Sequence, residues 1–439
     1  MAPIRYSLAH LSSSFKALIF LMNIAGLFAR NQFLKNLGWM GASEIFIRVT
    51  RLFCTVILAR CLTELEYGHA AIILTAFEFI RVFTRNGISD KIIQAPDEDI
   101  EILCQTAYTL NWLVALFLFF VQAAGAFFAA LFYKDNSLIF PIVIVGLSYL
   151  VYPFSMVQCS LIYRSNKLKV MSIAQLLQVG LGNILSAVMA LAGLGIWAVV
   201  LPLILTPFAF VLFILSRCDW RPSARICFSK SRQILGFGGN ILGVSLLDTF
   251  RQNIDYLIVG KMVGIAALGT YYFAFNAGLG ISLSLIGAIS VSLYSDLCSV
   301  QGDKLLLRSR LISNLRTIAS IVIPVVFFQV LLAPFYVPII FGGKWVAAGA
   351  VPILSLICLS AIPRPFANAA SMYFRAIGRP RVDLLWNFIF SLLLLGSIVK
   401  GVEYGVIGVA VAVLVVHFLF QPLYLLFALR VSRHESLGC

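Results

Sequence analysis

The chain has 439 residues, of which 61% are hydrophobic and 12% charged, and its mean hydropathy is +0.97. Soluble domains use apolar residues for only about half of their length, so this composition excludes a soluble protein and predicts a membrane protein. The net charge of +15 does not indicate a nucleic-acid partner, because no basic run is interleaved with aromatic residues on a soluble module.

The first predicted element is the apolar run 17–29, ALIFLMNIAGLFA, which resembles the core of a signal peptide. No small-residue cleavage site follows it, and it is too short to span a bilayer. We therefore interpret 1–36 as a cytoplasmic or interfacial N-terminal extension, or residues 1–30 as the product of an upstream start codon.

Longer apolar runs follow, each long enough to cross a hydrocarbon core of about 30 Å at about 1.5 Å per helical residue. The sequence thus predicts an all-α polytopic membrane protein with about twelve transmembrane helices. The predicted spans are 37–59, 67–86, 105–132, 138–163, 170–192, 194–216, 234–260, 265–297, 311–341, 346–374, 384–399 and 404–429.

Lysine and arginine are distributed unevenly between the two sets of predicted loops. If both termini are cytoplasmic, only five basic residues lie outside, namely Arg60, Lys134, Lys261, Lys344 and Lys400. Cytoplasmic loops carry an excess of Lys and Arg, so we expect both termini in the cytoplasm. The chain is therefore expected to cross the membrane several times, and the resemblance described below implies the bacterial cell (inner) membrane.

The two halves of the chain are similar. At a shift of 201 residues, 33–71 resembles 234–272, so that Gly68 aligns with Gly269 and Arg60 with Lys261. An even number of spans in each half predicts parallel repeats related by an axis along the membrane normal, a common design of transporters in which two bundles rock about a site at their interface. The predicted domains are 37–216, a six-helix bundle; 217–232, a basic cytoplasmic linker; 233–429, a second six-helix bundle; and 430–439, a cytoplasmic tail.

Two spans at equivalent positions each carry a charged stripe, spaced as residues on one helix face are. The stripes are Glu44, Arg48 and Arg51 in 37–59, and Asp248, Arg251 and Asp255 in 234–260. A charge at the bilayer centre costs about 2.5 kcal/mol or more, so we expect both stripes to face a wet lumen between the halves. Glu78 in the second span and Arg364 in the tenth add to this lumen.

The chemistry of these side chains suggests two roles. A guanidinium binds phosphate oxygens in a bidentate manner and stays charged, which predicts an anionic, phosphate-bearing substrate. A carboxylate in a low-dielectric lumen can exchange H⁺ or bind Na⁺, so ion coupling is expected. The candidate substrate-binding residues are Arg48, Arg51, Arg251 and Arg364, and the candidate ion-coupling residues are Asp248, Asp255, Glu44 and Glu78.

A structural alternative applies to each charge taken singly. Asp248 with Arg251, and Glu44 with Arg48, form neutral pairs that could serve only to hold helices together. Taken together, these pairs leave Arg51 and Arg364 without an acidic partner in the predicted stripes. Pro153 and Pro365 occupy matching positions in the two halves and are candidate hinges or kinks, because proline frees a backbone carbonyl.

No catalytic or metal chemistry is predicted. The chain contains no phosphate-binding loop of an ATPase, so we expect a transporter without an ATP motor rather than an enzyme. The nine cysteines show no metal-ligand spacing, and His417 is interpreted as a satisfied polar residue within the last span. No cofactor is expected apart from H⁺ or Na⁺ as a coupling ion.

Several segments resemble the Wzx-like polysaccharide flippases of the multidrug/oligosaccharidyl-lipid/polysaccharide (MOP) superfamily. ARCLTELEYGHAA at 59–71 resembles the signature after the first span of these proteins, although Thr63 to Glu66 lack its proline. RQNIDYLIVGKMVGIAALGTYYFA at 251–274 resembles the corresponding motif of the second half, which makes Asp255 a fold residue as well as an ion-coupling candidate. GLGIWAVV at 193–200 is similar to the family's entry to the sixth span.

The resemblance implies a flippase that moves an undecaprenyl-diphosphate-linked oligosaccharide to the outer leaflet for O-antigen, capsule or exopolysaccharide synthesis. It also implies a cationic lumen for the diphosphate, H⁺ or Na⁺ coupling, and a pathway that includes a polymerase and glycosyltransferases. We expect a functional monomer in contact with membrane lipids. The alternatives are a cation-coupled multidrug or metabolite antiporter of the same superfamily, and a non-transporting membrane partner of glycan synthases.

Overall fold

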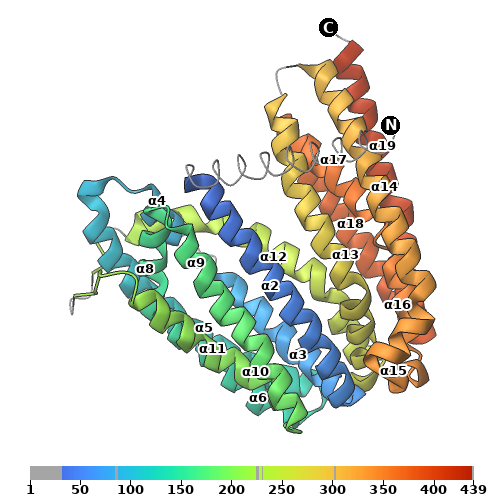
Figure 1. Ribbon diagram of the computed structural model, residues 1–439, viewed down its shortest axis with the longest axis horizontal. Coiled ribbons are helices and arrows are strands. Elements are labelled where there is room, and N and C mark those ends of the chain that lie inside the picture. Colours follow the sequence, from blue (N-terminus) through green and yellow to red (C-terminus); the bar gives the residue numbers. More distant parts are fainter. Residues whose placement is uncertain (1–31, 85–87, 224–226, 230, 301–302, 438–439) are drawn as a thin grey trace, which may run out of the picture.

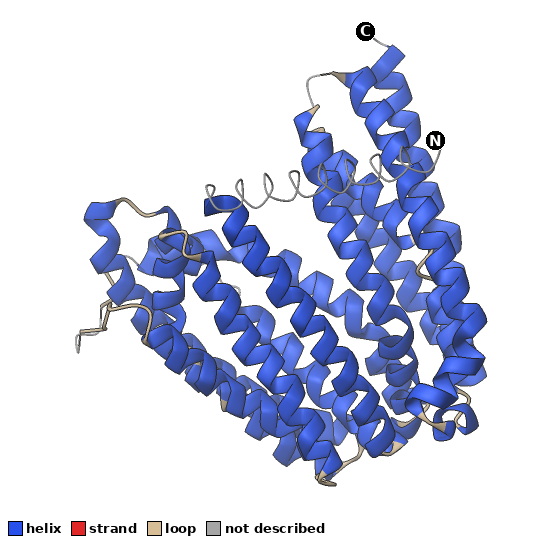
Figure 2. Ribbon diagram, in the orientation of Figure 1, coloured by secondary structure: helices blue, strands red, loops and turns tan. Residues whose placement is uncertain are grey.

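The computed structural model describes residues 32–437 except 85–87, 224–226, 230 and 301–302. Every regular element in this part of the chain is a helix, as Figure 2 shows. The prediction of an all-α fold is confirmed. The signal-like run 17–29, with the rest of 1–31, lies outside the described residues.

The N-terminal bundle is built from ten α-helices and short connecting turns. These are α2 (Gln32–Cys61), α3 (Glu64–Arg81), η1 (Val82–Thr84), α4 (Ile88–Gln94), η2 (Asp97–Asp99), α5 (Ile100–Tyr133), η3 (Asn136–Leu138), α6 (Ile139–Gly146), α7 (Ser148–Val151), α8 (Pro153–Arg164), α9 (Leu168–Gln175), the π-helical turn η4 (Leu176–Gly180), α10 (Leu181–Leu191) and α11 (Trp197–Leu215).

The C-terminal bundle repeats this pattern with fewer breaks. It contains α12 (Ser231–Met262), α13 (Ile265–Ser299), α14 (Lys304–Tyr336), the π-helical turn η5 (Val337–Phe341), α15 (Gly343–Ala347), α16 (Ala350–Leu359), α17 (Arg364–Ala376), α18 (Pro380–Gly401), η6 (Val402–Tyr404) and α19 (Gly405–Leu437).

Each predicted span coincides with a helix or with consecutive helices. By length and composition alone, six of the described helical segments are able to cross a membrane, or seven when the bent segment 136–164 is counted as one span. The chain is therefore a multi-pass membrane protein, as predicted, and the total of twelve remains a prediction.

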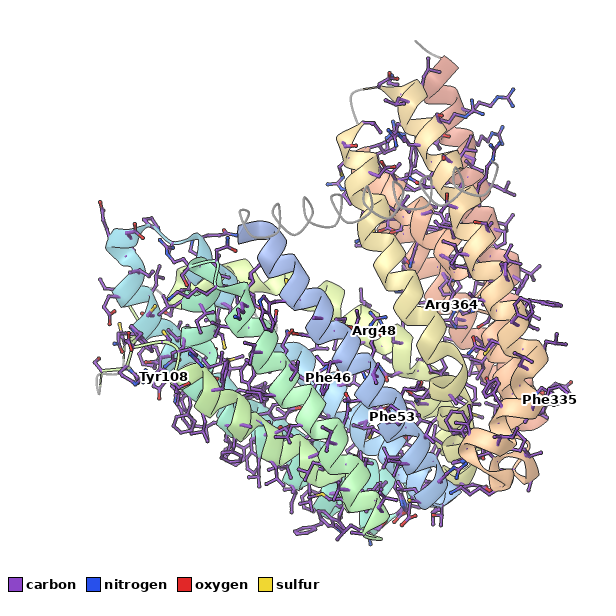
Figure 3. All side chains as sticks on the ribbon, viewed as in Figure 1. Phe46, Arg48, Phe53, Tyr108, Phe335 and Arg364 are labelled. Atoms are coloured by element: carbon purple, nitrogen blue, oxygen red, sulfur yellow. The ribbon has the colours of Figure 1, made fainter. Side chains whose placement is uncertain are left out.

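The outer surfaces of the bundles suit lipid. Large apolar side chains stand exposed along α5 and α14, including Phe120 and Phe335, each 66% exposed. Figure 3 shows Phe335 on the side of the C-terminal bundle that faces away from the N-terminal bundle. Exposed phenylalanines in such number would make a soluble protein aggregate, whereas a bilayer solvates them.

The two bundles form a V (Figure 1). They diverge toward the end at which α19 finishes, which we call the open end. At the opposite, closed end, α3 of the N-terminal bundle packs along α13 of the C-terminal bundle. An aromatic cluster fills this junction: Tyr67 lies edge-on to Trp345 at 5.2 Å, and Trp345 stacks on Phe273 at 4.0 Å between ring centroids.

Helix α12 departs from the symmetry that the repeat predicts. It packs against α13 and α18 of its own bundle, and also against α3, α4 and α5 of the N-terminal bundle. The ring of Phe250 lies 6.3 Å from that of Phe79 on α3. By contrast α2, its counterpart, packs chiefly on α9, η4 and α10 of its own bundle. Helix α12 therefore straddles the two bundles.

Described residues of the linker after α11 contact α5. The indole nitrogen of Trp220 donates to Glu101 Oε2 at 3.1 Å, and the backbone nitrogen of Cys227 donates to Thr109 Oγ1 at 3.3 Å. The predicted linker 217–232 thus continues into α12, which begins at Ser231.

Candidate functional site

A polar cluster lies inside the C-terminal bundle where α12, α13 and α17 meet. Arg364, the first residue of α17, folds back over the break after α16, and its Nε and Nη2 donate to the backbone oxygen and Oγ of Ser360 at 3.3 and 3.2 Å. Its guanidinium is close enough to Tyr271, Asp255 and Arg251 to interact with them electrostatically. Two partly buried arginines from different helices therefore lie within electrostatic range of each other.

Asp255 is built into the frame of this cluster. The carboxylate is only 8% exposed, and its Oδ2 accepts a hydrogen bond of 2.8 Å from the hydroxyl of Tyr271 on α13. Its Oδ1 accepts from the backbone nitrogen of Tyr256 at 3.0 Å. A buried carboxylate needs such donors, and here they tie α12 to α13.

Arg251 contacts a different helix from Asp255. Its Nη1 donates to Asn387 Oδ1 on α18 at 2.7 Å. Arg251 and Asp255 of the predicted stripe thus bond residues of different helices, α18 and α13, and the role of the stripe in a common lumen stays a prediction. The side chain of Asp248 lies outside the described residues.

The stripe on α2 is more open. Arg48 Nε bonds Glu44 Oε1 at 3.0 Å, and the two side chains are 42% and 56% exposed. Figure 3 shows Arg48 on α2 at a height similar to that of Arg364 in the other bundle. Arg51 is exposed one turn further on, and in the described part of the chain no carboxylate lies within salt-bridge distance of Arg51 or Arg364.

Glu78 on α3 forms an ion pair with Arg81, at 2.6 Å between Oε1 and Nη2. Both charges act electrostatically on Tyr149 and Tyr152 of the N-terminal bundle. The pair is the neutralised arrangement that the structural alternative describes, and it does not join the cluster around Arg364.

The two prolines follow breaks at corresponding places. Pro153 is the first residue of α8, and the chain bends by 49° between 136–151 and α8. Pro365 lies in the first turn of α17, after the break at 360–363. Proline is tolerated there because the first turn of a helix has no partner for the missing N–H. Pro153 therefore lies at a bend, and the role of either proline as a hinge or a kink stays a prediction.

Three further polar residues border the cluster, and two of them, Asp383 and Asn387, were not identified from the sequence. Asp383 and Asn387 lie one turn apart on α18, and the buried His417 on α19 bonds the backbone oxygen of Val413 through Nδ1 at 2.7 Å. That bond agrees with the interpretation of His417 as a satisfied residue. Asp383 follows Arg379 and Arg381 near a predicted loop, and no pattern in the sequence distinguishes it from ordinary loop charges.

Basic side chains lie at the closed end of the V. Arg60 on α2 donates from Nε to the backbone oxygen of Ile340 at 2.7 Å and from Nη2 to that of Ile339. In return, Lys344 of α15 donates to the backbone oxygens of Arg60, at 3.0 Å, and of Leu62. The exchange is reciprocal, and it satisfies carbonyls at the end of α2 and in η5 that lack helical partners.

Two more contacts reinforce this closure. The indole nitrogen of Trp345 donates to the backbone oxygen of Ala59 at 2.8 Å. Lys261, the repeat counterpart of Arg60, donates to the backbone oxygen of Phe132 and lies 4.6 Å from the centre of its ring. Arg60, Lys261 and Lys344, predicted to share one side of the membrane, therefore take part in contacts between the bundles at the closed end.

Comparison with known proteins agrees with this architecture. Residues 57–350 match the family of polysaccharide biosynthesis proteins. An uncharacterized membrane protein in the cps region of Klebsiella pneumoniae is 24% identical over 87% of this chain and 79% of its own length. The teichuronic acid biosynthesis protein TuaB of Bacillus subtilis (strain 168) is 21% identical over 91% of this chain and 84% of its own length.

Solved structures share the fold. A multidrug resistance MATE family transporter of the MOP superfamily in its inward-facing conformation superposes with a TM-score of 0.73 and 14% identity, over 88% of this chain and 96% of that one. The lipid II flippase MurJ in an inward closed conformation superposes with a TM-score of 0.70 and 17% identity, over 89% of this chain and 87% of that chain. An outward-facing conformation of a MATE family transporter superposes with a TM-score of 0.51 and 16% identity, over 94% of this chain and 93% of that chain. These likenesses show that the chain shares the fold of these transporters.

The family match covers more than half of the chain, and two similar bundles with the MOP fold carry it. The chain therefore belongs to the family of polysaccharide biosynthesis proteins.

Proposed function

We propose that this protein is a flippase that moves an undecaprenyl-diphosphate-linked oligosaccharide from the cytoplasmic to the outer leaflet of the bacterial inner membrane. The observation that carries this proposal is the proximity of Arg251 and Arg364, two arginines from separate helices inside a membrane bundle. Two guanidinium groups within electrostatic range of each other attract an anion that carries several oxygens. A diphosphate offers the oxygens that guanidinium groups bind best.

The arginines of α2 would complete the binding surface from the other bundle. Arg51 is exposed and has no carboxylate partner among the described residues, and Arg48 shares its charge with Glu44. A substrate held between Arg51 on one side and Arg251 and Arg364 on the other contacts both bundles. Its binding energy then acts on their relative position, as a rocking mechanism requires.

The direction of transport follows from the expected orientation. The excess of Lys and Arg supports cytoplasmic termini, so the closed end with Arg60 and Lys344 would face outward and the open end would admit the lipid from the cytoplasmic leaflet. H⁺ or Na⁺ is the proposed energy source, with Glu44, Glu78, Asp248 and Asp255 as candidate carriers. Of these, Glu44 and Glu78 are paired with arginines and Asp255 with Tyr271.

The proposed partners follow from the substrate. The protein would receive lipid-linked units from glycosyltransferases and deliver them to a polymerase, acting as a monomer in the membrane. The alternative is a cation-coupled antiporter, and the structural likeness to a multidrug transporter supports it. The proximity of Arg251 and Arg364 opposes it, because these side chains repel cationic drugs.

The test is export of surface glycan in a strain that lacks its own copy of the gene. Alanine at Arg48, Arg51, Arg251 and Arg364 together is expected to abolish export while the protein still reaches the membrane. The control removes the same number of charges outside the cluster, at Lys167, Arg217, Lys400 and Arg430. Normal export by the first variant, or drug efflux by the wild type without glycan export, would contradict the proposal.

A further inference from the structure

The bond between Arg251 and Asn387 is the first link of a longer polar chain. Arg251 lies on α12, the helix that straddles the bundles, and Asn387 lies on α18 of the C-terminal bundle; the Nη1 to Oδ1 distance is 2.7 Å. Asn387 therefore determines where at least one edge of the guanidinium points. A guanidinium has five N–H donors, so this bond orients the group without using its full donor capacity.

The amide of Asn387 is itself oriented by Asp383. Its Nδ2 donates to Asp383 Oδ1 at 2.7 Å and to the backbone oxygen of Asp383 at 2.8 Å. An amide nitrogen only donates and an amide oxygen only accepts, so two acceptors on one side fix which atom faces Arg251. If the amide were rotated by half a turn, Nδ2 would point at a cation and the oxygen at a carboxylate.

Asp383 is in turn held on both of its oxygens. It is 4% exposed, its Oδ2 accepts from Arg375 Nε at 2.8 Å, and its Oδ1 also accepts from the hydroxyl of Tyr424 at 3.0 Å. These donors come from α17 and α19, so the carboxylate is fixed by the three helices that form the core of this bundle. The ion pair with Arg375 already compensates the buried charge of Asp383. The hydrogen bonds through Asn387 to Arg251 are therefore not required for that compensation.

We propose that Asp383 and Asn387 are positioning residues that aim the Arg251 guanidinium at the diphosphate of the substrate. This inference rests on the proposed function. The path runs from the rigid core of the C-terminal bundle, through one amide, to the helix shared by the two bundles. A guanidinium that is oriented before the substrate arrives loses less side-chain freedom on binding. Asp383 and Asn387 therefore raise the affinity without contacting the ligand.

The test measures binding of undecaprenyl diphosphate without sugar to the purified full-length protein in detergent, together with the thermal unfolding temperature. Arg251→Ala is expected to weaken binding by about tenfold or more, because it removes a charge-assisted contact. Asn387→Leu keeps the side-chain volume and is expected to weaken binding by a similar factor. The double variant should bind no worse than Arg251→Ala alone, since Asn387 acts through Arg251.

Two further variants keep this test decisive. Asp383→Asn retains the shape of the side chain but removes the carboxylate that accepts the hydrogen bond from Asn387 Nδ2. We expect this variant to bind more weakly than the wild type. In the Arg251→Ala background the same substitution should have no further effect on affinity. Ser391→Ala is the matched control on α18, because its hydroxyl bonds only the backbone oxygen of Asn387. It should leave affinity unchanged.

The outcomes separate the inference from the proposed function. If Arg251→Ala weakens binding but Asn387→Leu and Asp383→Asn only lower the unfolding temperature, the residues are structural and the inference is overturned. The inference is also overturned if the double variant Arg251→Ala with Asn387→Leu loses affinity by the product of the two single losses, because the two residues would then act independently. If Arg251→Ala leaves affinity unchanged, the role of Arg251 in substrate binding is itself wrong, and the positioning role fails with it.

Discussion

Gly68 and Gly269, which the internal repeat aligns, each lie against the backbone of the opposite bundle. A Cβ atom on Gly68 would be 2.0 Å from the carbonyl oxygen of Ile265, and one on Gly269 would be 1.9 Å from that of Glu64. Each glycine thus permits α3 and α13 to meet at the closed end, next to the first residue of the other helix. The contact is symmetric, as expected for parallel repeats around an axis between the bundles.

Alanine at either glycine is expected to force α3 and α13 apart, because a backbone oxygen cannot move aside as a flexible side chain can. Overpacking of this kind costs about 1–3 kcal/mol or more. Gly68→Ala and Gly269→Ala should each lower the thermal unfolding temperature of the purified protein. Gly396→Ala is the control, since nothing lies within 4 Å of a Cβ at that helical position. Equal unfolding temperatures for all three variants would contradict this reading of the contact.

The reciprocal bonds of Arg60 and Lys344 should stabilise the closed end relative to an alternative with this end open. Arg60→Ala with Lys344→Ala is expected to shift the population toward that alternative. Pulsed electron paramagnetic resonance between spin labels on α4 and α14, in a cysteine-free background, measures the distance at the open end, which should shorten. Lys400→Ala removes a charge predicted to lie on the same side and should leave the distance distribution unchanged.

Arg364 should depend on its guanidinium geometry as well as on its charge. Arg364→Lys keeps the charge but loses bidentate binding, so we expect glycan export to fall by about tenfold. Ser360→Ala removes one of the two groups that hold Arg364 and should reduce export less. Export rates of surface glycan at matched protein levels distinguish the two. Full activity of Arg364→Lys would mean that only the charge is used.

Asp135, in the turn between α5 and η3, gives the closed end a pH dependence. Burial raises the pKa of this carboxyl, but hydrogen bonds from Ser137 and His69 outweigh it and hold the pKa below its usual value. The ionised form is thus favoured in the folded state. Its contribution to stability is present above the unfolded pKa of about 3.9, and it is lost as the pH falls through the folded pKa.

Thermal unfolding of the wild type and of Asp135→Asn tests this dependence. The wild type should be more stable at about pH 5 and above, and the difference should shrink as the pH falls below about 4. Ser137→Ala removes one of the donors, at 2.6 Å from Asp135 Oδ1, and should give a smaller difference of the same form. A difference that persists unchanged to the lowest pH at which the protein stays soluble would contradict the assignment to Asp135.

Composition and repetition determined the broad outline of this protein. Apolar runs must form helices in a bilayer, because unpaired backbone groups are not tolerated there, so the all-α fold was predictable. The alignment of Gly68 with Gly269 predicted two similar halves, and the structure places both glycines at their junction. The spacing of Glu44 and Arg48 likewise predicted a shared helix face, and the two side chains bond each other.

The partners of the buried charges were decided only by tertiary structure. Helical periodicity gives the direction of a side chain about its own axis, but not which helix lies there. Arg251 and Asp255 share an arc on α12, yet α18 receives one and α13 the other. Asp383 and Asn387 lie far along the chain from Arg251, and no local pattern links them. Likewise, the straddling of α12 and the closure by Arg60 and Lys344 depend on packing between distant helices, which the order of residues along one helix does not encode.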